Sequence, residues 1–210
     1  MNKITLSVAV ALAVTGTACT NLERSRDLAN PNVSPAITAI QVCSNCHGAT
    51  GNPVSPNFPR LAGQQPDYIV TQLENFRSHH RSDPAGFEYM WGISRSFSDV
   101  QIKGFAEYFS KQTPLPGLAG DPALMATGKE IYEKGAGKDA TPCMACHGAK
   151  GEGLATFPRL AYQHADYMIK QLHVFRETEG RPGTPMKEIT HGLTDQQIVA
   201  VAAYLQAFPN

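Results

Sequence analysis

Residues 43–49 read CSNCHGA, and residues 143–149 repeat the pattern as CMACHGA. The similarity extends beyond this stretch, because the FPRLA of residues 58–62 returns at residues 157–161. Further matches follow in the same order to the end of each unit. The chain is therefore an internal duplication with a unit of about ninety residues.

A connector rich in proline and glycine, TPLPG at residues 113–117, separates the two units. Proline and glycine in such a cluster end regular structure and favour a stiff link. We expect a first domain over residues 35–115 and a second over residues 116–210. A leader at residues 1–18 and a linker at residues 19–34 precede them.

Both units have the pattern of helices. Apolar side chains recur at helical spacing in the middle of each unit. They are Tyr68, Ile69, Leu73 and Phe76 in the first unit and Tyr167, Met168, Leu172 and Phe175 in the second. Near the end of each unit, Ser98 with Gln101 and Thr194 with Gln197 fit a capping box before an apolar run. Because no convincing alternating strand pattern is present, we expect an all-α fold.

The pattern CxxCH is the attachment signal of a c-type haem. Two thiols on one helical turn add to the two vinyl groups, and the adjacent histidine then reaches the iron. The attachment residues are Cys43, Cys46 and His47 in the first unit and Cys143, Cys146 and His147 in the second. A zinc site would need both cysteine pairs to converge, and a redox CxxC would need a βαβ context. Two matches in register favour two covalently bound haem c groups.

The sixth position of each iron decides between electron transfer and ligand binding. Met90 is the only methionine of the first unit, and in the second unit only Met186 matches it in register. Met168 lies in an apolar helix stripe and Met144 lies inside the CxxCH turn. We expect Met90 and Met186 to be axial ligands, since a thioether favours ferrous iron and closes the site to substrates.

Matched residues after each CxxCH pattern are candidates for supporting roles. A ligating histidine normally donates its other ring N–H to a carbonyl, and Pro59 and Pro158 can present one. Arg60 and Arg159 follow them and can pair with haem propionates, although a solvated surface role is as good an interpretation. Residues 79–81, HHR, have no counterpart in the second unit, and we interpret them as a solvated loop.

The first eighteen residues predict export from the cytoplasm. Lys3 is followed by a short apolar run and then by small residues up to Ala18, which is typical of a secretory signal peptide. We expect a periplasmic protein. Cys19 follows at once, which favours either lipidation and a membrane tether or an incidental cysteine beside a soluble cleavage site.

The charge balance gives no sign of a nucleic-acid partner. The first candidate domain carries six basic and six acidic residues, and the second carries nine basic and ten acidic residues. Neither half has the excess of basic residues that binding to nucleic acid requires. A strong patch for steering one acidic or basic protein partner is not predicted either.

The tandem CxxCH motifs, the FPRLA blocks, the Gln-Leu helices and the methionine before each final helix resemble the cytochrome c4 family of di-haem cytochromes c. The similarity covers nearly all of the chain from about residue 35. It implies two class I cytochrome c domains related by pseudo-twofold symmetry, with haems near the domain interface. It also implies a carrier that takes electrons from respiratory complexes or dehydrogenases to an acceptor such as a terminal oxidase. The segment before Met90 is three residues longer than its counterpart before Met186.

Two other functions remain open from the sequence. The chain could be the cytochrome subunit of a larger dehydrogenase, for example with a flavoprotein, and an extended apolar patch would then mark the permanent partner. It could also be a di-haem peroxidase. That chemistry needs an open iron position with a nearby acid or base, whereas Met90 and Met186 would close both irons.

Overall fold

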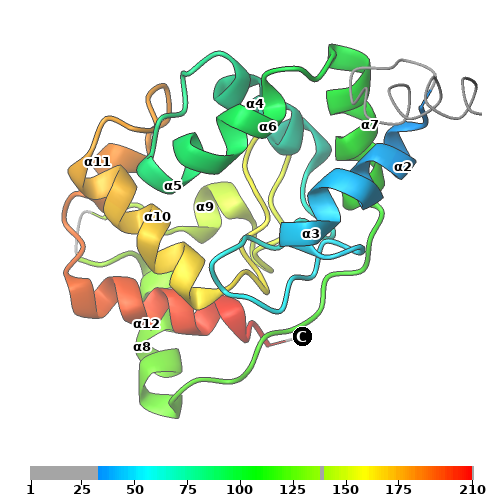
Figure 1. The fold of residues 1–210 in the computed structure, drawn as a ribbon. Helices are drawn as coiled ribbons and strands as arrows, with labels where there is room; N and C mark the ends of the chain where they lie inside the picture. Colours follow the sequence, from blue (N-terminus) through cyan, green and yellow to red (C-terminus); the bar gives the residue numbers. More distant parts are fainter. Residues whose placement is uncertain (1–32, 138–139, 210) are drawn as a thin grey trace, which may run out of the picture.

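The computed structural model describes residues 33–137 and 140–209, in two helical halves that pack against each other (Figure 1). The first half holds α2 (Pro35–Thr38), π-helical turn η1 (Ala39–Cys43), α3 (Ser44–His47), α4 (Pro66–Arg77), α5 (Pro84–Gly86), π-helical turn η2 (Phe87–Trp91), α6 (Gly92–Ser94) and α7 (Asp99–Ser110). The second half holds α8 (Pro122–Lys134), α9 (Met144–His147), α10 (Ala165–Glu177), α11 (Met186–Thr190) and α12 (Asp195–Gln206). The predicted leader, Cys19 and all but the last two residues of the predicted linker lie outside the described residues.

The described residues form no β-strand. Their one departure from helices, turns and loops is an isolated bridge between Leu154 and Phe157. The all-α expectation is therefore confirmed for this part of the chain. None of the helices within it has the length and apolar character needed to cross a bilayer.

The two predicted amphipathic helices are α4 and α10. Helix α4 begins at Pro66, where a missing N–H costs nothing, and it buries Ile69 and Phe76. Helix α10 buries Met168 and Leu172 on the matching face, with Met168 only 6% exposed. The predicted core role of Met168 is confirmed.

Both predicted capping boxes are present. In α7, the Ser98 hydroxyl accepts from the Gln101 backbone N–H at 3.3 Å, and the Gln101 side chain accepts from the Ser98 backbone N–H at 3.0 Å. In α12, Thr194 and Gln197 make the same pair of bonds at 3.2 and 2.9 Å. Each box satisfies backbone donors that the first helical turn leaves without a partner.

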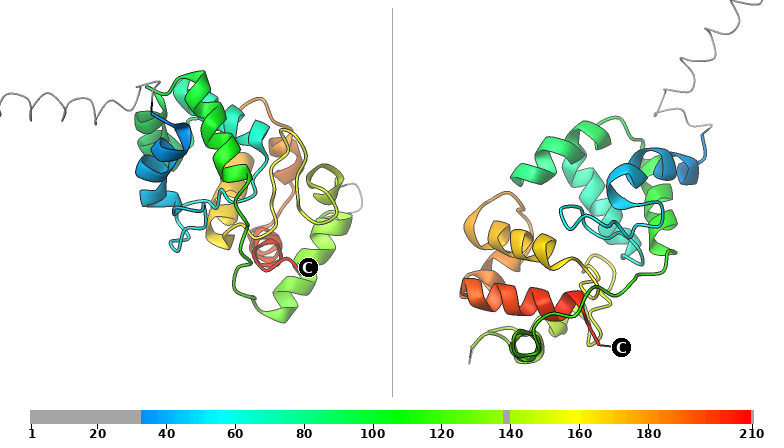
Figure 2. Two further views of the ribbon diagram at one scale, coloured as in Figure 1. Left: turned by 90° about the vertical axis from the view of Figure 1, so that its right-hand side faces the viewer. Right: turned by 60° about the horizontal axis from the view of Figure 1, so that its bottom comes forward.

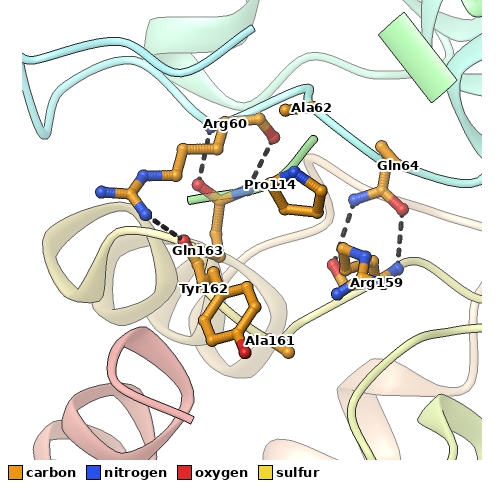
Figure 3. A pocket seen from close by; sticks show the side chains of 8 residues that line it. All are labelled: Arg60, Ala62, Gln64, Pro114, Arg159, Ala161, Tyr162 and Gln163. Atoms are coloured by element: carbon orange, nitrogen blue, oxygen red, sulfur yellow. Dashed lines mark hydrogen bonds between the residues drawn. The ribbon is translucent and has the colours of Figure 1, made fainter. Parts of the chain in front are cut away.

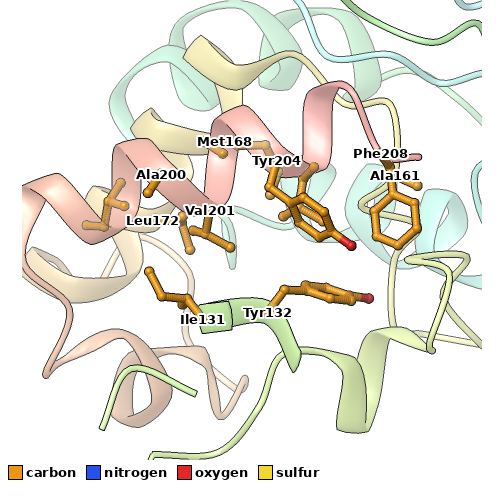
Figure 4. Packing of buried hydrophobic residues seen from close by; sticks show 12 residues of the cluster. Ile131, Tyr132, Ala161, Met168, Leu172, Ala200, Val201, Tyr204 and Phe208 are labelled. Carbon is orange, nitrogen blue, oxygen red and sulfur yellow. The ribbon is translucent and has the colours of Figure 1, made fainter. Parts of the chain in front are cut away.

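The core of the second half lies where α8 crosses α12. Gly128 of α8 allows the close approach, because a Cβ there would overlap the Ala200 carbonyl oxygen of α12. Figure 4 shows Ile131 and Tyr132 facing Val201 and Tyr204 across this crossing. The Tyr132 ring lies 5.9 Å from the ring of Tyr204 and 5.7 Å from that of Phe208.

In the first half, the segment that begins with α2 packs on α7 in the corresponding way. Here the glycine is on the C-terminal helix, because a Cβ at Gly104 would overlap the ring of Pro35. The buried core consists of Ala39, Ile69, Phe97, Ile102, Phe105, Ala106 and Phe109. Residues 111–121 then connect α7 to α8 along one side of both halves (Figure 2). Asn52 fixes this connector through bonds to Thr113 and Leu115 at 3.0 and 3.1 Å.

Candidate functional site

One continuous cavity of about 820 Å³ receives all of the predicted ligand side chains from both halves. They are Cys43, Cys46, His47, Met90, Cys143, Cys146, His147 and Met186. Apolar side chains such as Ile69, Leu73 and Leu172 line much of the rest. The volume lies in the upper part of the range of about 300–1,000 Å³ that is common for small-molecule pockets.

Each CxxCH pattern folds as a single short helical turn. Helices α3 and α9 end at His47 and His147, and the next residues, Gly48 and Gly148, have φ angles of +75° and +83°. Glycine adopts this left-handed backbone without a steric penalty, so the chain turns away directly after each histidine. The thiols and the imidazole of each motif are thereby held on one turn.

The four cysteines among the described residues are free of disulfides, and each CxxC pair stays in its own half. Burial raises the pKa of the Cys43 thiol to about 12 and that of Cys143 to about 11. Burial therefore favours the protonated thiol at these two positions. Within the described residues, no group of three or more His, Cys, Asp or Glu side chains is arranged to hold a metal ion.

Both histidines are fixed by a backbone carbonyl. His47 Nδ1 lies 2.9 Å from the Pro59 oxygen, and His147 Nδ1 lies 2.9 Å from the Pro158 oxygen. The predicted role of the two proline carbonyls is confirmed. Burial lowers the pKa of both imidazoles, so each is neutral. With Nδ1–H donated to the carbonyl, Nε2 is the nitrogen left to bind an iron.

The two methionines lie on different local structures. Met186 begins α11, where Thr190 Oγ1 donates to its carbonyl at 2.7 Å. Met90 lies in η2, within the longer segment of the first half, beside Trp91. Trp91 stacks on Phe87 at 5.9 Å and lies 4.8 Å from the His79 ring, so its role is packing at the surface of this segment.

The residues present fit two c-type haems. Each half supplies two thiols on one turn, an imidazole with an oriented ring and a thioether, all of which line the same largely apolar cavity. This donor set matches the attachment and axial chemistry of haem c.

The arginines after the two prolines join the halves of the protein. The Arg60 guanidinium donates to the carbonyls of Tyr162, at 2.9 Å, and of Leu115, and Arg159 Nε donates to the Gly63 carbonyl at 3.0 Å. These bonds replace the solvated surface position considered from the sequence. Pairing with haem propionates stays a prediction.

Two glutamines that follow the FPRLA blocks, and for which the sequence predicts no role, complete this joint (Figure 3). The Gln163 side chain accepts from the Arg60 N–H at 2.8 Å and donates to the Arg60 carbonyl at 3.0 Å. The Gln64 side chain makes the same two bonds to Arg159, at 2.6 and 3.0 Å. Their identical position in the repeat was the signal available in the sequence. His164 also bridges the halves, through a 3.0 Å contact from Nε2 to the Pro53 oxygen.

A second polar cluster between the halves corrects the interpretation of residues 79–81 as a solvated loop at Arg81 alone, since His79 and His80 are exposed as predicted. Arg81 is only 5% exposed, and its Nε lies 2.7 Å from Asp83 Oδ1. It also donates across the interface to Gln171 at 3.0 Å. The prediction for Arg81 is wrong because a single sequence does not reveal Asp83, two residues later, as a buried counterion.

The symmetry of this cluster is approximate but clear. Arg181 of the second half donates back to Tyr68, at 3.1 Å, and to Gln72, at 2.8 Å, in the first half. Burial alone would raise the pKa of the Asp83 carboxyl, but the Arg81 charge and hydrogen bonds from Arg81 and Gln171 hold it below its usual range. Asp83 is therefore ionised at neutral pH.

Known proteins resemble this chain along most of its length. A family model described as Cytochrome c matches residues 125–208. The cytochrome c4 of Azotobacter vinelandii is 36% identical, over 98% of this chain and 99% of that protein. A thiosulfate dehydrogenase electron acceptor of Stutzerimonas stutzeri is 34% identical, over 79% of this chain and 78% of that one. The structure of reduced cytochrome c4 from Pseudomonas stutzeri matches with a TM-score of 0.74 at 33% identity, over 82% of this chain and 96% of that chain.

Proposed function

The chain belongs to the cytochrome c4 family, and on that premise we propose that it moves single electrons between redox proteins without catalysing a reaction of its own. The fold is that of two tandem class I cytochrome c domains, the cofactors are covalently bound haem c, and the function is di-haem electron transfer. The observation that carries the proposal is the single cavity into which both sets of donor side chains point. Each haem, when bound, supplies an iron that changes reversibly between the ferrous and ferric states.

The repeated donor sets assign one haem to each domain. Cys43 and Cys46 would hold the first haem through thioether bonds, with His47 and Met90 as axial ligands. Cys143, Cys146, His147 and Met186 would hold the second in the same way. Hydrogen bonds from each histidine to a proline carbonyl fix the ring and raise its basicity.

Closure of both axial positions separates a carrier from a catalyst. A peroxidase needs an iron position open to its substrate and an acid or base beside it. Met90 and Met186 both line the cavity and would fill these positions. We therefore retain the carrier in preference to the peroxidase.

Absorption spectroscopy of the pure protein, with a pyridine haemochrome assay, tests the proposal. We expect two haems per chain and, in the oxidised protein, a charge-transfer band near the red end of the visible spectrum, which is typical of sulfur bound to ferric iron. Met90→Ala and Met186→Ala should each remove about half of this band, since each takes away one sulfur ligand. Met168→Leu, which changes a thioether of the core, should retain the whole band. One haem per chain, or an unchanged band in both alanine variants, would contradict the assignment.

We place the protein in the periplasm on the strength of the leader pattern at residues 1–18. Fractionation of cells that express the full chain tests this location. If Cys19 carries a lipid, Cys19→Ser moves the protein from the membrane fraction to the soluble periplasmic fraction. A wild type that is already soluble would identify an untethered carrier.

The similarity to a thiosulfate dehydrogenase electron acceptor favours a second candidate, in which a dehydrogenase that oxidises a sulfur compound is the donor. Respiratory complexes as donors and a terminal oxidase as acceptor stay the first candidate. Gel filtration of the chain mixed with a purified dehydrogenase separates a subunit from a shuttle. Co-elution as a stable complex supports the subunit, while rapid reduction without co-elution supports the shuttle, because fast exchange of partners needs a small interface.

A further inference from the structure

The peptide unit between Pro59 and Arg60 is hydrogen-bonded at both ends. Its carbonyl oxygen lies 2.9 Å from His47 Nδ1 in the same domain. Its N–H donates to Gln163 Oε1 in the other domain, at 2.8 Å. A single amide therefore connects the histidine of the first domain to a glutamine of the second.

The second domain repeats this arrangement in the opposite direction. The carbonyl of Pro158 lies 2.9 Å from His147 Nδ1, and the N–H of the same peptide unit, at Arg159, donates to Gln64 Oε1 at 2.6 Å. Two chains of hydrogen bonds thus cross the domain interface in opposite directions, and we call each one a relay. The first runs from Gln163 through the Pro59–Arg60 amide to His47, and the second runs from Gln64 through the Pro158–Arg159 amide to His147.

The glutamines are held in place for this role. Gln64 and Gln163 are 5% and 6% exposed, so little water competes for their amide groups. Each also donates its Nε2–H to the carbonyl of the arginine that it accepts from, at 3.0 Å in both cases. These paired bonds fix each Oε1 toward the amide of the opposite domain (Figure 3).

Bonds at the two ends of an amide strengthen each other. An N–H that donates polarises the amide and makes its carbonyl oxygen a better acceptor, by about 10–30% per bond. A better acceptor at Nδ1 makes the imidazole a more basic ligand. A more basic ligand favours ferric over ferrous iron and so lowers the reduction potential.

We propose that Gln163 lowers the reduction potential of the first haem and that Gln64 lowers the reduction potential of the second, each across the domain interface. Docking of the domains then lowers both potentials, and by reciprocity the oxidised protein has the tighter interface. This inference rests on the proposed function, in which His47 and His147 are axial ligands. Both glutamines act through the histidines and are positioning residues.

The test is a redox titration of each haem in Gln163→Leu and Gln64→Leu, with the haems distinguished by NMR. In Gln163→Leu the ferrous-to-ferric ratio of the first haem at a fixed potential should rise about threefold, with the second haem unchanged, because only one relay has lost its polarising bond. Gln64→Leu should raise the reduction potential of the second haem alone. The His47 Nδ1–H resonance of the reduced protein should move upfield only in Gln163→Leu.

Gln65→Leu is the matched control. The Gln65 side chain also crosses the interface, donating to the carbonyls of Glu152 and Gly153 at 2.8 and 3.2 Å, and it makes no bond to either relay. The backbone N–H of Gln65 donates to Gln64 Oε1 at 2.8 Å, and the substitution retains this bond. Gln65→Leu should change the reduction potential of neither haem. Three outcomes would overturn the proposal. They are an equal shift of both reduction potentials in one variant, a shift only for the haem of the domain that carries the substitution, and the same shift in Gln65→Leu.

Gln163→Glu keeps an acceptor oxygen for the Arg60 N–H and serves if the leucine variant does not fold. It should give no rise in the ferrous fraction of the first haem, and a rise would overturn the proposal. The wild type separates this test from that of the function. A wild type without two low-spin haems contradicts the function, whereas two normal haems whose potentials stay fixed in every variant contradict the relay alone.

Discussion

At the scale of single residues, the buried ion pair of Arg81 and Asp83 sets a dependence on pH. The side chains are 6% and 1% exposed, and the atoms of the pair lie 2.7 Å apart. The pKa of Asp83 is lowered in the folded protein, because Arg81 and the hydrogen bonds to Asp83 outweigh its burial. Its contribution to stability is therefore complete above the unfolded pKa of about 3.9 and is lost as the pH falls through the lower folded value.

Asp83→Asn tests this dependence. We expect the variant to be less stable than the wild type at pH 7 by about 3 kcal/mol, since it leaves the Arg81 charge buried without a counterion. The difference should shrink as the pH falls below about 4, because the Asp83 carboxyl of the unfolded wild type then takes up a proton that the folded protein, with its lowered pKa, does not. Urea unfolding at a series of pH values measures both effects.

Asp99→Asn is the control for this prediction. Asp99 also pairs with an arginine, Arg77, at 2.7 Å, but its side chain is 68% exposed. Exposed pairs of this kind contribute no more than about 1 kcal/mol. An equal loss of stability in both variants would show that burial of the Asp83 pair has no special effect.

Residues with local chemistry could be predicted from the sequence, whereas residues that act between the halves could not. The CxxCH turns, the proline carbonyls and the core position of Met168 each follow from a motif or a helical period. Gln64 and Gln163 carry no motif, and their partners are about one hundred residues away in the sequence. Only the docking of the halves brings them together.

At the scale of helices, the α8–α12 crossing depends on one missing side chain. A Cβ at Gly128 would overlap the Ala200 carbonyl, which is backbone and has little freedom to move. We expect Gly128→Ala to lower the free energy of unfolding by about 1–3 kcal/mol, as overpacking of a core does. Thermal and urea unfolding of the second domain, followed by circular dichroism, measure the loss.

Gly192→Ala is the comparison in the same domain. No atom lies within 4 Å of the position of its Cβ, so this substitution should be neutral or slightly stabilising. If Gly128→Ala is as stable as Gly192→Ala, the two helices separate more easily than the packing implies.

Long helices with a clear period were predicted well, and the short segment that carries Met90 was not. Helices α4, α7, α10 and α12 have apolar stripes and, in two cases, capping boxes. The longer segment that carries Met90 instead forms α5 and η2, where Gly86 packs on Phe76 and Asp83. Such a segment takes its shape from tertiary contacts, which override local preference.

At the scale of the whole molecule, each half donates hydrogen bonds from an arginine to the other half. Arg81 of the first half bonds to Gln171 of the second, and Arg181 of the second bonds to Tyr68 and Gln72 of the first. The glutamine bonds to Arg60 and Arg159 join the halves elsewhere in the interface. If all of the bonds between the domains break together, the loss of a bond in the Arg81 and Arg181 cluster should also speed amide exchange at the glutamine bonds to Arg60 and Arg159.

Hydrogen exchange in Arg181→Met tests this coupling. The variant loses hydrogen bonds from a charged donor, which are worth about 1.5–3 kcal/mol each. We expect the amides of Arg60 and Arg159 to exchange about ten- to a hundredfold faster, since one factor of ten corresponds to about 1.4 kcal/mol. The amide of Ile102, whose bond to Ser98 lies within α7 and its cap, should keep its rate.

Arg176→Met supplies the matched control, because the Arg176 guanidinium bonds within the second half, to the Leu193 carbonyl and to Asp195. It should leave the Arg60 and Arg159 amides unchanged. Faster exchange only at Ser82, whose amide bonds to Gly180 beside the substitution, would show local loosening in place of a cooperative interface. A cooperative interface would mean that any partner that disturbs one cluster also acts on the glutamine relays, and through them on both haem potentials.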